Sequence, residues 1–208
     1  LADITNTILE FGKKEMNNSI EIEFACDLET PPRTPRIFNL LQIRPVVHSE
    51  ESSTISLEDV KPEDTIIYSE SALGHGIFRD ISDLVYVKPE SFNPSRNRGL
   101  SVIIENLNST LAGQGKGYVL IGPGRWGSTD PWLGIPVKWA QISAVRLIVE
   151  SGLENYRIDP SQGTHFFQNL TSFGVGYFNI NPFIDEGYYD VDYLNSLRPV
   201  YEDDALRH

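Results

Sequence analysis

A histidine at the start of an apolar segment is the residue of this sequence best suited to covalent chemistry. In the stretch SQGTHFFQNLTSFGVGYF (161–178), His165 follows Thr164 and a glycine. We expect a short helix to begin here, and a helix N-terminus offers N–H donors and a partial positive charge to a phosphoryl group. Neutral imidazole is a nucleophile near neutral pH, and Thr164 can cap the helix and donate to a phosphoryl oxygen. The alternative is a histidine with a purely structural role. The remaining histidines are weaker candidates: His48, His75 and His208.

Two carboxylates, an amide and a guanidinium are spaced to share one face of a predicted hairpin. Apolar and polar residues alternate over 19–28, which places Glu21 and Glu23 on the same face, and the next predicted strand places Gln42 and Arg44 together. Carboxylate and amide oxygens are ligands that Mg²⁺ favours, and the arginine fork fits phosphate oxygens. If the two faces coincide, the group can hold a metal–nucleotide, with Glu21 and Arg44 near the nucleotide. The alternative is a solvated sheet face that carries a cross-strand ion pair.

A glycine-rich loop follows a predicted buried strand in IGPGRWGSTDPWLGIP (121–136). Glycines allow the backbone to approach an anion closely, and Arg125 adds a positive charge, so Arg125 is a candidate nucleotide contact. Trp126 and Trp132 could stack on a base or a sugar. The loop matches neither the Walker pattern nor the dinucleotide fingerprint. The alternative is a tight turn whose tryptophans pack on the core.

These segments resemble the phosphoenolpyruvate synthase and pyruvate phosphate dikinase family. IEIEFACDL…FNLLQIRPVV is similar to the closing strands of the family's ATP-grasp domain, and this resemblance assigns Glu23 and Gln42 to the metal and Arg44 to phosphate. Thr-His, eight further residues and Gly-Val resemble the motif of its swivelling domain, whose histidine takes phosphate from ATP and delivers it to a second site. The resemblance therefore implies phosphorylation of His165, with ATP and Mg²⁺ as cofactors. The chain departs from the family in its longer loop ETPPRTPR and in the residues SQGT before the histidine.

Three functions follow from these patterns. The first is a fragment of an ATP-dependent phosphotransferase that relays phosphate from Mg–ATP through a histidine to an acceptor. The second is a catalytically degenerate module that binds a nucleotide or a partner domain. The third is a structural interaction domain whose acidic, tyrosine-rich C-terminal segment docks on a partner.

The elements that would position these residues indicate an α/β fold. We expect a helix over 3–16 and two antiparallel strands, which together form the end of an ATP-grasp domain at 1–47. A polar, acidic linker follows at 48–64. The mixed strands and helices of 65–208 predict an α/β domain, and the resemblance implies that it is a mixed-sheet, swivelling-type phosphohistidine domain. Further predicted elements are a helix in 99–113, strands in 117–121 and 174–180, and either a helix or a helix followed by a strand in 139–152.

Composition limits the partners and the setting. The chain has 208 residues and a net charge of −12, and an acidic chain repels the phosphate backbone, which disfavours nucleic acid as a partner. No apolar stretch reaches the roughly 20 residues that span a bilayer, so no membrane partner is expected. A lone cysteine excludes an internal disulfide and favours a cytoplasmic location. Because the sequence starts at Leu1 within a predicted helix, we expect a piece of a longer polypeptide, with a nucleotide and the remaining domains as partners.

Overall fold

Two units make up the fold, Leu1–His48 and Ser49–His208, and each is described by itself. In the described part of the chain, no helix has both the length and the apolar character needed to cross a bilayer. The predicted residues His48, His75, Thr164 and His165 lie outside the described part, as does most of the predicted linker. The computed structural model describes residues 1–16, 20–29, 31, 34–45, 60–74, 76–79, 81–152, 161, 170 and 174–208.

The smaller unit is a helix followed by a β-hairpin, as the sequence predicts. It consists of α1 (Ala2–Met16), β1 (Ile20–Cys26) and β2 (Phe38–Pro45), and the two strands are antiparallel. The apolar face of α1 packs on the hairpin at Gly12, which lies directly against Ile20. The absence of a side chain at position 12 is what allows this close approach.

A β-bulge interrupts the pairing of the two strands, with Leu41 of β2 as the extra residue. The pairing register shifts between Glu23 and Phe24, so Phe24 pairs with Leu40. A bulge places an extra residue in one strand and turns the side chains that follow. The ring of Phe24 stacks on that of Phe38, with centroids 4.8 Å apart.

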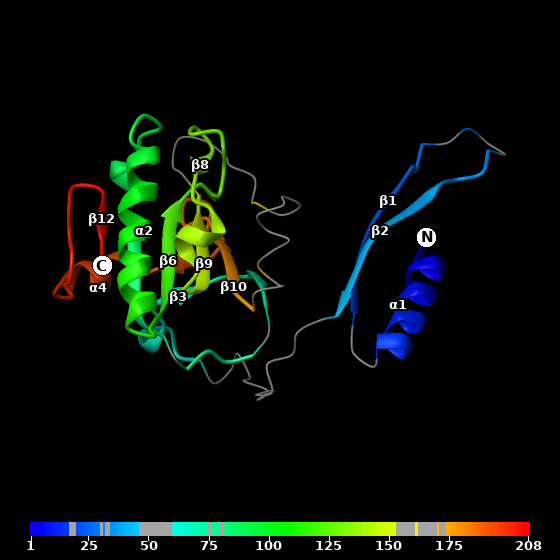
Figure 1. The fold of residues 1–208 in the computed structure, drawn as a ribbon, viewed down its shortest axis with the longest axis horizontal. Coiled ribbons are helices and arrows are strands. Elements are labelled where there is room, and N and C mark those ends of the chain that lie inside the picture. The colour runs from blue at the N-terminus through cyan, green and yellow to red at the C-terminus, as the bar shows by residue number, and fades with distance from the viewer. Residues whose placement is uncertain are drawn as a thin grey trace. The chain divides into compact units, whose positions relative to one another are not determined.

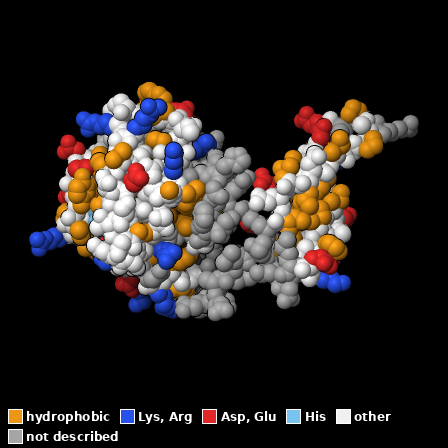
Figure 2. All heavy atoms as spheres, in the orientation of Figure 1, with side chains coloured by type: hydrophobic (Ala, Val, Ile, Leu, Met, Phe, Trp, Pro, Cys, Tyr) orange, Lys and Arg blue, Asp and Glu red, His pale blue; other side chains and the backbone are white. Residues whose placement is uncertain are grey.

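The hairpin unit exposes many large apolar side chains, and Figure 2 shows a group of hydrophobic atoms on its visible face. So small a unit cannot bury all of its apolar side chains, because its surface is large relative to its volume. The exposed apolar residues include Leu1, Ile4, Phe11, Phe24, Leu28, Ile37, Leu40 and Leu41.

The larger unit is built on a mixed six-stranded sheet with the strand order β12-β5-β6-β9-β10-β4 (Figure 1). The central strands β5, β6, β9 and β10 are parallel to one another, while β12 and β4 lie antiparallel at the two edges. The strands are β3 (Ile67–Tyr68), β4 (Ser71–Leu73), β5 (Ile81–Val87), β6 (Gly117–Pro123), β7 (Arg125–Trp126), β8 (Gly134–Ile135), β9 (Val145–Ser151), β10 (Gly176–Ile180), β11 (Tyr188–Tyr189) and β12 (Leu206–Arg207). The helices are α2 (Asn97–Gly113), α4 (Val191–Ser196) and the short 3-10 helices η2 (Pro62–Asp64), η3 (Pro89–Ser91) and η4 (Trp139–Ile142).

Both faces of this sheet are covered, so the unit has two hydrophobic cores. Alternate residues of a strand point to opposite faces, and Leu120 belongs to the core beneath α2 whereas Val119 and Ile121 belong to the core on the other face. The second face is covered by residues around Tyr189 and Leu194. Burial on both faces explains why β6 is buried along its whole length.

The C-terminal segment is part of this sheet. The sequence offered it as a candidate docking tail, but Leu206 is fully buried and pairs with Val87 as the edge strand β12. The ambiguous segment 139–152 forms the short helix η4 and then strand β9. Its run of branched residues in VRLIV, typical of a strand, prevails over the helical spacing.

Gly134 provides a test of the packing around the glycine-rich loop. A side chain at this position would overlap the backbone of Arg125 on the paired strand β7, whereas Gly99 in α2 has open space around it. We expect Gly134→Ala to lower the free energy of unfolding by about 2–3 kcal/mol. Gly99→Ala should raise it by up to about 1 kcal/mol because alanine favours helix. Urea unfolding of both variants checks this, and a Gly134→Ala variant as stable as the parent would contradict the described pairing.

Candidate functional site

The hairpin brings the predicted metal and nucleotide residues opposite one another. Glu21 pairs with Arg44, and Glu23 pairs with Gln42. Residues directly opposite in an antiparallel pair have Cβ atoms about 4.5–5.5 Å apart, close enough to share one ion or one phosphate. Glu21, Glu23 and Gln42 also line a common pocket with Ile22, of about 60 Å³. That volume suits a cation with water, and it is too small to enclose a nucleotide.

The predicted phosphohistidine is not among the described residues, but the start of its segment is. Ser161, four residues before His165 in sequence, is buried and bound to Glu150 near the end of β9. In open α/β sheets, ligands bind outside the carboxyl ends of the parallel strands. Ser161 itself therefore lies at the edge of the sheet where ligand sites occur.

The glycine-rich loop uses its own N–H groups internally. The N–H of Gly124 donates to Ser151, that of Arg125 to Leu133 and that of Gly127 to Ile135, over 2.8–2.9 Å. Donors that are paired within the protein cannot also cradle an anion, so these groups do not form a phosphate-binding loop. For this loop the interpretation as a tight turn is the better one. Both Gly124 and Gly127 have positive φ, which explains the glycines.

The two tryptophans near this loop have different environments. Trp126 is 1% exposed, and its indole N–H donates to the carbonyl of Val149 over 3.0 Å. It packs closely on Gly122, where no side chain would fit. Trp126 therefore belongs to the core and is not available to stack on a base, whereas Trp132 is 64% exposed. Arg125 is partly buried and engaged in an interaction of its own.

A buried carboxylate, Glu150, joins three segments at the carboxyl edge of the sheet. One carboxylate oxygen accepts from the N–H of Trp126 over 2.9 Å and from the hydroxyl of Ser161. The other accepts from the N–H of Ser161 over 3.0 Å and from the hydroxyl of Tyr177 over 2.7 Å. Glu150 is 2% exposed, and burial raises its pKa, although the hydrogen bonds partly offset that effect. In the sequence, Glu150 is an acidic side chain directly after the apolar residues LIV. An acid buried at such a position must be paired, and this is the signal that could have pointed to it.

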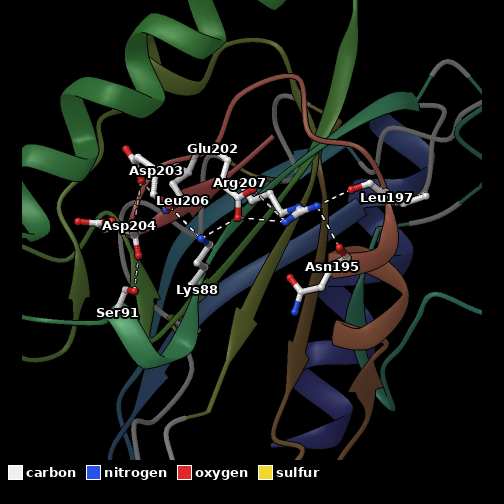
Figure 3. A network of polar contacts seen from close by, with 10 residues as sticks. Lys88, Ser91, Asn195, Leu197, Glu202, Asp203, Asp204, Leu206 and Arg207 are labelled. Carbon is white, nitrogen blue, oxygen red and sulfur yellow. Dashed lines mark hydrogen bonds and ion pairs between the residues drawn. The ribbon is translucent and has the colours of Figure 1, made fainter.

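A second polar cluster holds the C-terminal segment against β5 (Figure 3). Lys88, which follows β5, pairs with Glu202 over 2.8 Å and donates to the carbonyl of Asp203 over 2.9 Å. Arg207 donates to both carboxylate oxygens of Glu202 and to the carbonyls of Asn195 and Leu197. This network fixes β12 at the edge of the sheet and so fixes the residue that follows it.

That residue is His208, which on the sequence alone is a weak candidate for a functional histidine. In the structure its Nε2 lies 2.9 Å from Oδ1 of Asp83, and both side chains are more than nine-tenths buried. Both residues line a cavity of about 400 Å³. They are 125 positions apart in the sequence, and only the pairing of β12 with β5 brings them together.

Neither the metal-ligating side chains nor comparison with known proteins assigns a function to these residues. Among the described residues there is no group of three or more His, Cys, Asp or Glu side chains that could hold a metal ion. The hairpin set has two carboxylates and one amide, so a metal bound there would need ligands from the nucleotide or from water. Comparison of the chain with protein-family models, curated proteins and solved structures gives no match.

The raised pKa of Glu150 predicts how stability depends on pH. An unfolded glutamate loses its proton near pH ~4.3, whereas the native Glu150 retains its proton to higher pH, so ionisation costs stability as the pH rises. We expect the stability advantage of the parent over Glu150→Gln, which cannot ionise, to be largest near pH ~4 and to shrink toward pH ~7. Urea unfolding of both proteins across this range measures the difference. An advantage that grows with pH would show instead that the surrounding donors stabilise the carboxylate.

Proposed function

We propose that this chain is part of an ATP-dependent phosphotransferase that resembles the phosphoenolpyruvate synthase and pyruvate phosphate dikinase family. The observation that carries the proposal is the hairpin register, which places Glu21 opposite Arg44 and Glu23 opposite Gln42. Four residues chosen by type and spacing thus form two adjacent cross-strand pairs. A solvated sheet face would not require that particular combination of hard oxygen ligands and a guanidinium.

In this proposal the hairpin contributes one wall of a Mg–nucleotide site. Glu23 and Gln42 would hold the metal through their oxygens, and Arg44 would bind a phosphate group, with Glu21 beside it. Bound Mg²⁺ would neutralise charge on the nucleotide phosphates. The exposed apolar side chains of this unit agree with further ATP-grasp sequence covering them in a longer polypeptide.

The larger unit would be the swivelling-type phosphohistidine domain. A nitrogen of His165 would attack a phosphorus of ATP, so that a P–N bond forms, a P–O bond breaks and the nucleotide leaves. Thr164 would donate a hydrogen bond to the transferred group. Support comes from Ser161, which Glu150 holds at the carboxyl edge of the parallel strands. The single cysteine agrees with a reducing, cytoplasmic setting for this enzyme.

Phosphoryl transfer to the histidine has a direct test. The chain, expressed together with its flanking sequence, is incubated with Mg²⁺ and ATP that carries radioactive phosphorus in its terminal phosphates. We expect protein-bound label that is stable in base and labile in acid, and we expect it to be absent in His165→Ala and present in His75→Ala. No label in any of these proteins would remove the phosphotransferase proposal.

Metal–nucleotide binding separates an active enzyme from a degenerate module. Calorimetry should show Mg-dependent ATP binding that Glu23→Ala weakens by about tenfold or more, because a metal ligand is lost. Glu29→Ala, which removes an exposed carboxylate outside the strands, should leave the affinity unchanged. Binding without label on His165 would favour the nucleotide-binding module, and ATP affinity that is equal with and without Mg²⁺ would contradict the assignment of Glu23.

A further inference from the structure

The cavity beside His208 has the properties of a ligand site and has no role in the proposed phosphotransfer. It measures about 400 Å³ and lies between the second face of the sheet and the C-terminal segment. Its lining is largely apolar, and a few polar side chains converge on it. Small-molecule sites typically combine an apolar wall with a small number of placed polar groups. The apolar lining includes Ile67, Ile81, Leu84, Val119, Leu194 and Leu197.

Asp83 fixes the orientation and the protonation of the His208 ring. The Asp83 carboxylate accepts from Ser82 over 2.6 Å and pairs with Lys116 at 3.2 Å. Burial alone would raise the pKa of Asp83, but hydrogen bonds from Ser82, His208 and Lys116 and the charge of Lys116 together lower it. An ionised carboxylate can only accept, so the His208 nitrogen facing it, Nε2, carries hydrogen.

The other ring nitrogen of His208 then has no partner. In the neutral ring, Nδ1 carries a lone pair once Nε2 is protonated. Nδ1 is buried, and no hydrogen-bond partner for it exists in the described part of the chain. A buried polar atom without a partner is unfavourable, so its presence calls for a donor from outside the protein. His208 is one of the residues that line the cavity, so a ligand bound there lies beside the ring.

An arginine supplies the second recognition element. Two arginines line the cavity, and the guanidinium of Arg207 is committed to Glu202 and to backbone carbonyls. Arg198 is exposed and makes no ion pair or hydrogen bond with any residue that the structure describes. In a chain with a net charge of −12, an uncommitted guanidinium beside an apolar cavity favours a carboxylate ligand, which it can bind through two parallel hydrogen bonds.

From these three features we propose that the cavity binds a small, largely apolar carboxylate that also carries an N–H or O–H donor. The apolar body would occupy the space between the sheet and α4. The carboxylate would pair with Arg198, and the donor would satisfy Nδ1 of His208. Because the site is built entirely within residues 66–208 and uses none of the hairpin residues, it is independent of the proposed phosphotransferase activity.

Three related compounds test each feature of the ligand on the full chain. Indole-3-acetate has the apolar body, the carboxylate and an N–H donor, 1-naphthaleneacetate lacks the donor, and tryptamine replaces the carboxylate by an ammonium group. By calorimetry we expect indole-3-acetate to bind with a Kd of about 1 mM or tighter. The other two compounds should each bind about tenfold more weakly, which corresponds to the loss of one hydrogen bond or ion pair.

Variants and the native protein then locate the binding. Arg198→Gln should weaken indole-3-acetate binding about tenfold, whereas Arg36→Gln, an exposed arginine of the other unit, should not change it. Since a His208 variant could disturb the edge strand, the ring is observed directly: its Nδ1 resonance in the isotope-labelled parent should shift when the compound is added. The proposal is overturned if neither carboxylate binds at concentrations up to about 10 mM. It is also overturned if indole-3-acetate binds but does not shift the Nδ1 resonance, and Arg198→Gln does not change its affinity.

Discussion

The hydrogen bonding of one buried carboxylate is the constraint on which the functional edge of this sheet depends. Glu150 receives hydrogen bonds from the glycine-rich loop through Trp126, from the segment after β9 through Ser161 and from β10 through Tyr177. Three segments that leave the parallel strands are thereby held at one point. Without Glu150 these donors would be buried and unpaired, which is more costly than the net gain from a typical hydrogen bond. The position of Ser161 follows from this arrangement.

The residues suited to binding and catalysis are divided between the two units. The hairpin carries residues suited to a metal and a phosphate, while the larger unit carries the predicted phosphate acceptor and, on the second face of its sheet, a histidine with an unused nitrogen. The proposed function requires the nucleotide-binding and histidine-bearing parts to be separate bodies. The division at residues 48 and 49 agrees with that requirement. The His208 cavity would add small-molecule recognition to the same body.

The sequence predicted elements well where side-chain periodicity is local. α1, the hairpin pairing, α2 and β6 follow from patterns within a few residues. Alternation in two adjacent strands was enough to place Glu23 opposite Gln42, although it could not reveal the bulge that follows. The pair of His208 with Asp83 joins distant parts of the chain through an edge strand of two residues, too short to show any period. The glycine-rich loop left two interpretations open in the sequence, because glycines needed for positive φ and close packing have the same composition as those that bind anions.

Amide hydrogen exchange at Trp126 and Ser161 tests the role of Glu150 most directly. Trp126 lies in a strand of only two residues, and the N–H groups of Trp126 and Ser161 both donate to this carboxylate, so their protection depends on these bonds. The account predicts that both exchange as slowly as the central amides of β6 and β9, since all would open together. Exchange at rates typical of exposed loops, while β6 and β9 stay protected, would show that Glu150 does not hold this edge of the sheet.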